Sequence, residues 1–129
     1  MDANDLRLVL LVGAGGALGS VARYGVTGLL TRGNFPWGTF AVNFTGTFLL
    51  AFLFFLALGR GYLSSNLRSF LFVGVFGGYT TFSTFGLETT NLLREGQPYL
   101  AALNFGLNGG VCLVGALLGA ILGQFLGAG

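Results

Sequence analysis

Four long apolar segments dominate this chain of 129 residues. They run from Leu6 to Leu30, Thr39 to Leu58, Leu67 to Leu93 and Tyr99 to Leu126. An α-helix rises about 1.5 Å per residue, so each segment is long enough to cross a hydrocarbon core about 30 Å thick. Because 53% of the residues are hydrophobic and 8% are charged, a small soluble domain could not bury so much apolar surface. The sequence therefore predicts an all-α membrane protein, with one four-helix transmembrane domain over residues 1–129.

The chain is poor in the residues that catalysis and metal chemistry use. It has no histidine, four carboxylates and a single cysteine, Cys112. Most general-base chemistry and thiol or imidazole metal sites are thereby excluded. We expect no catalytic residue, no enzymatic activity and no nucleic-acid partner.

The third segment is interrupted by Gly77-Gly78-Tyr79-Thr80-Thr81-Phe82-Ser83-Thr84-Phe85. Glycine loosens a helical backbone, and Ser and Thr side chains offer competing hydrogen bonds. A helix broken inside a bilayer is tolerated only where protein or a wet cavity satisfies the freed backbone groups. The sequence therefore predicts a third helix broken at the membrane midplane, beside an ion site.

Polar residues recur every four positions in two other segments. The second carries Thr39, Asn43 and Thr47, and the fourth carries Asn104, Asn108 and Cys112. Residues at this spacing share one face of a helix. Each stripe has two interpretations that stay open here: hydrogen bonds between helices, or a track for an ion.

Beyond the interruption, Thr81, Thr84 and Glu88 share one helical face, and Phe82 and Phe85 share the next. A phenylalanine pair at this spacing usually only packs. Next to a break, however, the electropositive edges of two rings can face an anion and exclude water.

Two charged residues inside the segments are candidates for a pathway entrance. Glu88 is either a functional carboxylate, a residue that reaches the interface, or a partner for Arg23 or Arg94. Arg23 either extends to the interface or makes the mouth of a pathway electropositive.

All six basic residues are arginines, and they are balanced across the membrane. The side of the N-terminus has Arg7, Arg60 and Arg68, and the opposite side has Arg23, Arg32 and Arg94. Orientation normally follows an excess of Lys and Arg on the cytoplasmic side. Either one arginine dominates, or copies insert both ways up and pair antiparallel.

Small residues repeat at four-residue spacing in the first and fourth segments, a pattern that lets helix backbones approach closely. They are Gly15/Gly19, Gly16/Ser20, Gly106/Gly110 and the series Gly115, Gly119, Gly123 and Gly127. We expect most of them to pack within one chain. Four thin helices leave little room for a central pore, so a pathway between two chains is favoured.

The interrupted motif from Gly77 to Phe85, followed by Glu88, closely resembles the signature of the Fluc (CrcB) fluoride channels. The resemblance extends to Ser20-Val21-Ala22-Arg23-Tyr24 and to Pro36-Trp37-Gly38-Thr39 with Asn43. It covers all four segments. It implies a passive, fluoride-selective channel that exports fluoride across the inner membrane of a prokaryote. It also implies an antiparallel, dual-topology homodimer with two pores.

The same resemblance implies residue roles. The backbone carbonyls of Gly77 and Thr80 from both copies would hold a structural Na⁺ at the two-fold axis. The fluoride pore would be formed by Asn43 as a donor, Phe82 and Phe85 as ring edges, and the hydroxyls of Thr81, Ser83 and Thr84. Arg23 and Glu88 would lie at a vestibule and a pore entrance. Asn108 and Cys112 stand where hydroxyls are expected, and form a weaker polar track.

Two other functions compete with the channel. A proton-coupled exporter of small molecules needs a carboxylate in its cavity, typically in the first segment, which has none at membrane depth. A non-transporting subunit of a membrane assembly would use its polar stripes only for pairing.

Overall fold

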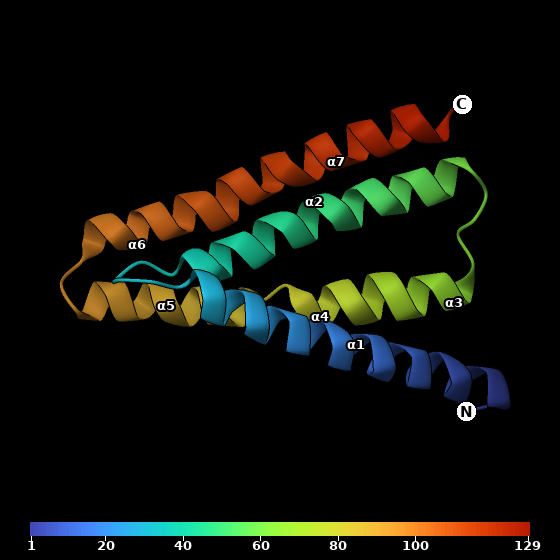
Figure 1. The fold of residues 1–129 in the computed structure, drawn as a ribbon, viewed down its shortest axis with the longest axis horizontal. Coiled ribbons are helices and arrows are strands. Elements are labelled where there is room, and N and C mark those ends of the chain that lie inside the picture. The colour runs from blue at the N-terminus through green and yellow to red at the C-terminus, as the bar shows by residue number, and fades with distance from the viewer.

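A computed structural model describes residues 1–129 as four antiparallel helical spans, with both termini at one end (Figure 1). The first two spans are continuous: α1 (Ala3–Leu30) and α2 (Trp37–Gly59). The third consists of α3 (Ser65–Leu67), the π-helical η1 (Arg68–Phe76), α4 (Gly77–Tyr79) and α5 (Phe82–Arg94). The fourth consists of α6 (Pro98–Phe105), the π-helical η2 (Gly106–Val111) and α7 (Cys112–Gly127). All four spans are long and apolar enough to cross a membrane, so the predicted all-α membrane class is confirmed.

Glycines bring two pairs of helices close together. Along α7, Gly115, Gly119, Gly123 and Gly127 are buried against α2. A Cβ atom added to Gly119 would collide with the carbonyl oxygen of Phe48. Gly15 and Gly19 of α1 face η1 in the same way. The expected packing within one chain is confirmed at these positions. Gly106 and Gly110 have no neighbour within 4 Å of an added Cβ, so they do not pack in this way.

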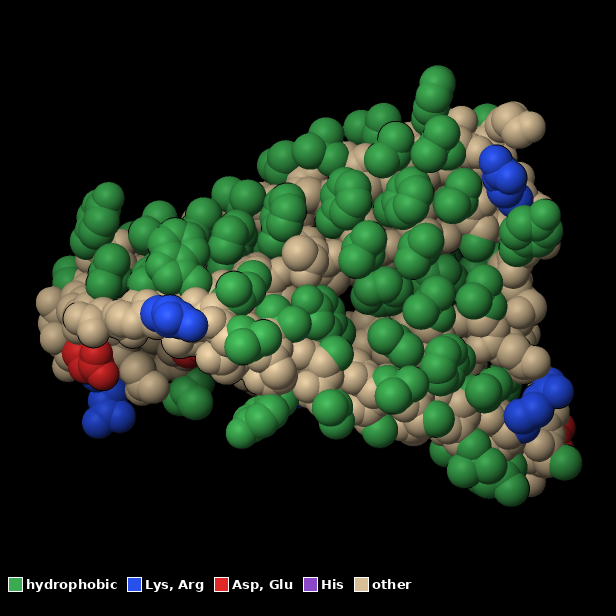
Figure 2. All heavy atoms as spheres, viewed as in Figure 1, with side chains coloured by type: hydrophobic (Ala, Val, Ile, Leu, Met, Phe, Trp, Pro, Cys, Tyr) green, Lys and Arg blue, Asp and Glu red, His purple; other side chains and the backbone are tan.

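Most of the surface is apolar. Only 22 of the 129 residues are buried, and large hydrophobic side chains are exposed on every span. Figure 2 shows them covering the visible face, with charged groups confined to the two ends of the molecule. Such a surface requires lipid or another protein chain around it, because water would not solvate it favourably. The chain is therefore a multi-pass membrane protein.

Candidate functional site

The backbone of the third span leaves helical geometry at two residues only. Thr80 (φ −82°, ψ 157°) and Thr81 (φ −150°, ψ 112°) are extended between α4 and α5. Gly77 is helical (φ −63°, ψ −36°), and a Cβ there would have no neighbour within 4 Å. Within this chain, therefore, the hydroxyl residues, and not the glycines, form the extended segment. Gly78 is also helical, and packs against the backbone of Gly16.

The side chain of Asn43 pairs with the backbone of Thr81 through two hydrogen bonds. The Thr81 N–H donates to Asn43 Oδ1 at 2.8 Å, and Asn43 Nδ2 donates to the Thr81 carbonyl at 3.0 Å. Both residues are buried. A buried backbone N–H or carbonyl without a hydrogen bond destabilises a membrane protein by several kcal/mol, because no water is present to replace the missing partner. Asn43 therefore satisfies both polar groups of the extended residue.

Thr81 is also the N-cap residue of α5. Its Oγ1 accepts the N–H of Thr84 at 3.2 Å and donates to Thr84 Oγ1 at 3.0 Å. The Ser83 hydroxyl lies 3.3 Å from the same oxygen. A threonine at this position satisfies an orphan amide at the helix start. The three hydroxyls predicted to line a pore are thus gathered at the first turn of α5.

The two carbonyls predicted to bind Na⁺ lack the amides that a continuous α-helix would give them. The Thr81 N–H, four residues beyond Gly77, donates to Asn43 instead. The Thr84 N–H, four residues beyond Thr80, donates to the Thr81 side chain instead. By contrast, the Gly78 carbonyl accepts a bond from Arg23 Nε at 3.0 Å. The interruption thus leaves the carbonyl oxygens of Gly77 and Thr80 without these amide donors.

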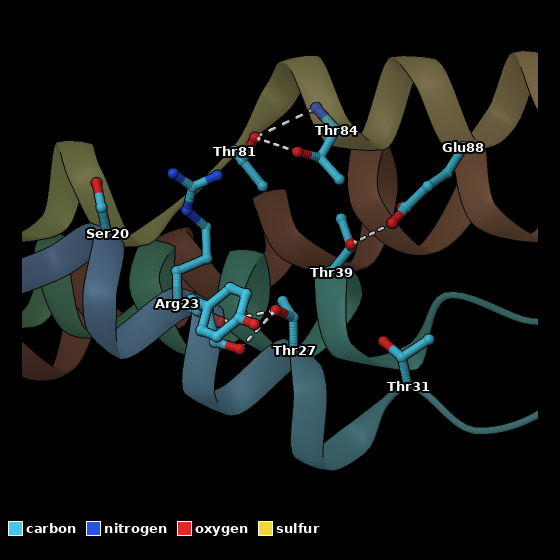
Figure 3. A pocket seen from close by; sticks show the side chains of 9 residues that line it. Ser20, Arg23, Thr27, Thr31, Thr39, Thr81, Thr84 and Glu88 are labelled. Atoms are coloured by element: carbon cyan, nitrogen blue, oxygen red, sulfur yellow. Dashed lines mark hydrogen bonds between the residues drawn. The ribbon is translucent and has the colours of Figure 1, made fainter.

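A polar cleft of about 340 Å³ opens beside the interruption (Figure 3). Its walls come from α1, α2, Thr81 and α5, and are mostly hydroxyl-bearing: Ser20, Arg23, Tyr24, Thr27, Thr31, Thr39, Thr81, Thr84 and Glu88. Arg23 extends from α1 toward Thr81. The cleft is thus rich in hydrogen-bond donors and holds one group of each charge.

Glu88 has no ion-pair partner, so neither Arg23 nor Arg94 neutralises it. Its Oε1 accepts the hydroxyl of Thr39 at 2.6 Å, from across the cleft. Its Oε2 is buried and accepts no hydrogen bond. Of the three interpretations of Glu88, the pairing with Arg23 or Arg94 is excluded within this chain.

Several cleft residues were not among the predicted site residues. Ser20, Arg23 and Thr27 lie at three- or four-residue steps on one face of α1, and Thr31 follows directly after the helix. This polar spacing at the end of the first span is visible in the sequence. The glycines of the same span also recur every four residues, and that pattern indicates packing alone.

The two phenylalanines of the motif have very different environments. Phe85 is 5% exposed and Phe82 is 82% exposed. Their rings meet edge to face, with centroids 5.3 Å apart and planes at 71°. Phe85 also lies near Phe105, at 6.3 Å between centroids. Within one chain, therefore, the rings contact each other and do not enclose a space.

The asparagines of the fourth span bond to other helices. Asn43 Nδ2 donates to Asn108 Oδ1 at 2.8 Å, and Asn108 Nδ2 donates to Asn104 Oδ1 at 2.9 Å. Asn104 is fully buried. Cys112 is buried, and only its backbone carbonyl accepts a bond, from Thr47 at 3.4 Å. In this chain Asn108 connects span four to span two, and Asn104 connects it to span three by donating to Thr89 Oγ1 at 3.0 Å.

Four apolar antiparallel spans, three of which line a hydroxyl-rich cleft, define a small multi-pass membrane protein. Residues 10–123 match the family described as CrcB-like protein, Camphor Resistance (CrcB). The chain belongs to this family, so the resemblance noted in the sequence is confirmed.

The relatives include three bacterial proteins named "Fluoride-specific ion channel FluC". One from Coxiella burnetii (strain CbuK_Q154) is 47% identical over 116 residues, which cover 85% of this chain and 92% of the relative. One from Rhodospirillum rubrum is 44% identical over 84% of this chain and 88% of the relative. One from Rhizobium meliloti is 54% identical over 69% and 74%, respectively.

Replacing Asn43 with leucine should destabilise the protein by roughly 2–4 kcal/mol. The change removes both bonds to Thr81 and leaves buried backbone groups unpaired, together with Asn108 Oδ1. Unfolding in detergent, followed by circular dichroism, measures the effect. The matched control is Asn91→Leu on α5, an exposed asparagine with no side-chain hydrogen bond. Equal stability of the two variants would show that Asn43 does not hold the interruption.

Proposed function

We propose that this chain forms a passive, fluoride-selective channel that lets fluoride leave the cytoplasm. The observation that carries the proposal is the hydroxyl-lined cleft that reaches the interruption held by Asn43. The names of the relatives supply the identity of the ion. The channel is an antiparallel, dual-topology homodimer in a prokaryotic inner membrane, with two pores and a structural Na⁺.

The lining of the cleft suits a small, strongly hydrated anion. Fluoride must exchange its water for donors of similar strength, and a narrow pore supplies these as hydroxyl and amide groups. The Thr84 hydroxyl donates to no other group, whereas the Thr39 and Thr81 hydroxyls would have to exchange their bonds to Glu88 and Thr84 for the ion. Arg23 adds a positive charge at the mouth. Chloride is larger and gains less from each donor, so a constriction framed by phenylalanine edges rejects it.

Glu88 places a carboxyl group in the same cleft as Arg23. One of its oxygens is occupied by the Thr39 hydroxyl, and the other has no partner. An anion that enters the cleft must therefore be stabilised by Arg23 and the hydroxyls against the charge of this carboxylate. The opposed charges keep an entering anion from binding too tightly to leave, which conduction requires.

A second copy is needed because one chain leaves its candidate pore half open. Phe82, with 82% of its surface exposed, lies on the outside of the interruption. Three arginines are expected on each side of the membrane, so neither orientation is favoured by charge. An inverted copy would cover Phe82 and complete a pathway at the interface. Two-fold symmetry then gives two such pathways.

The residues at the interruption fit a Na⁺ ion. The carbonyls of Gly77 and Thr80 lack their helical amides, and hard cations prefer oxygen ligands. Two carbonyls from each copy would hold the ion between the two interruptions. When bound, Na⁺ supplies a fixed positive charge that balances carbonyl dipoles brought close together.

Liposomes that contain the purified protein should release fluoride rapidly and chloride negligibly, as read with ion-selective electrodes. Phe82→Ile should lower the fluoride flux by up to about tenfold, since an edge-on aromatic contact is worth about 0.5–1.5 kcal/mol. Phe125→Ile is the matched control, because Phe125 is also exposed (77%) but lies near the C-terminus. A folded dimer without fluoride flux would exclude the channel, and leave the exporter or the assembly subunit.

Replacement of all Na⁺ by N-methyl-D-glucamine should lower the unfolding temperature of the purified dimer. A ligand that binds only the folded state at a hundred times its dissociation constant contributes about 2.7 kcal/mol. Differential scanning fluorimetry across a Na⁺ series, at constant ionic strength, measures the shift. An unfolding temperature independent of Na⁺ would contradict the structural ion and leave the fluoride pathway standing.

A further inference from the structure

A line of side-chain hydrogen bonds connects α2, the fourth span and α5. Asn43 Nδ2 donates to Asn108 Oδ1 at 2.8 Å, and Asn108 Nδ2 donates to Asn104 Oδ1 at 2.9 Å. Asn104 Nδ2 then donates to Thr89 Oγ1 at 3.0 Å. Thr89 Oγ1 donates to the carbonyl of Phe85 at 2.8 Å. We call these four residues, Asn43, Asn108, Asn104 and Thr89, the amide relay.

The direction of the amide relay is fixed by backbone groups, which have only one hydrogen-bonding role each. The N–H and carbonyl of Thr81 determine which end of the Asn43 amide is oxygen. The Asn104 carbonyl also accepts from Asn108 Nδ2, at 3.1 Å, so this nitrogen must point toward Asn104. The Thr89 hydroxyl donates its hydrogen bond to the Phe85 carbonyl. Toward Asn104, therefore, Thr89 Oγ1 can act only as an acceptor. Reversing any amide would bring two acceptors or two donors together.

The amide relay begins and ends on the first turn of α5. It is anchored at Thr81 by Asn43 and at Phe85 by Thr89. This turn carries both phenylalanines of the candidate pore. The relay therefore fixes the turn at both of its ends against the second and fourth spans.

Two members of the amide relay, Asn104 and Thr89, do not line the cleft and so would not contact an ion there. Asn104 has no exposed surface, and Thr89 is absent from the cleft walls. Their polar side-chain groups form hydrogen bonds with each other, with Asn108 and with the backbone. A buried network of this kind rigidifies its surroundings when every member is satisfied, and is costly when one is not.

We propose that Asn104, Asn108 and Thr89 are positioning residues: they orient the Asn43 amide and hold the turn that carries Phe82 and Phe85. This proposal rests on the fluoride channel proposed above and departs from the polar track expected for the fourth span. Asn104 and Thr89 act on the permeating ion through Asn43 and the phenylalanines.

Thr89→Val tests the proposal, because valine keeps the shape of threonine and removes the hydroxyl. It leaves Asn104 Nδ2 without an acceptor and frees the Phe85 carbonyl from its side-chain bond. Fluoride flux per folded channel should fall about fivefold to tenfold. The loss of one hydrogen bond lowers the fraction of channels in which the turn is correctly oriented by about this factor. Thr89→Ser retains the hydroxyl and should conduct like the unmodified protein.

Thr90→Val is the matched control. Thr90 lies next to Thr89 on α5 and bonds to the Gly86 carbonyl at 2.9 Å in the same way, but it is exposed and outside the amide relay. Its fluoride flux should be unchanged. A purely structural role for Thr89 would lower the amount of folded protein and leave the flux per folded channel unaltered.

The outcomes separate this inference from the function on which it rests. No flux from the unmodified protein contradicts the channel, and the inference with it. Unchanged fluoride flux in Thr89→Val overturns the inference and leaves the channel standing. The same holds if Thr89→Ser loses as much flux as Thr89→Val. Should Thr89→Val fail to assemble, Thr89→Cys, with its weaker donor, replaces it. A cysteine variant that conducts less than the serine variant supports the relay, and equal conduction overturns it.

Discussion

The interruption in the third span and the cleft beside it depend on the pairing of one side-chain amide with one backbone residue. Asn43 gives Thr81 an acceptor and a donor, as a neighbouring strand would, inside an apolar span. Without it, two extended residues at this depth would expose polar groups that lipid cannot satisfy. With it, α5 can start at Phe82, and the hydroxyls, carbonyls and phenylalanines that would otherwise be spread around one helix are brought to a single place.

The sequence predicts the class of fold well, because length and hydropathy alone require four helices in a bilayer. It also locates the interruption, but not its cause: the glycines at 77 and 78 are helical, and the extended residues are threonines. Local propensity cannot show this, since the extended backbone depends on Asn43, which lies on another helix. The π-helical segments are likewise not predictable, because hydropathy does not distinguish the two helical hydrogen-bond patterns.

The candidate site was only partly predictable for a related reason. Arg23, Thr81, Thr84 and Glu88 are expected because they are polar residues within apolar spans and match the family signature, and all four line one cleft. Thr27 and Thr31 join them only because α1 crosses near α2 and α5. The asparagine stripe of the fourth span had two open interpretations, and its hydrogen-bond partners on α2 and α5 could not be read from spacing. The roles of these residues toward an ion stay predictions.

The central claim is that inverted copies of this chain together complete the pathway that one copy leaves open. Two-sided labelling tests it most directly. Cys112 is replaced by alanine and Tyr62, exposed in the connection between α2 and α3, by cysteine. A membrane-impermeant maleimide is added to intact spheroplasts, and a second label is added after permeabilisation. Dual topology predicts that about half of the protein reacts from each side, following the balanced arginines. Labelling from one side alone would contradict an antiparallel homodimer.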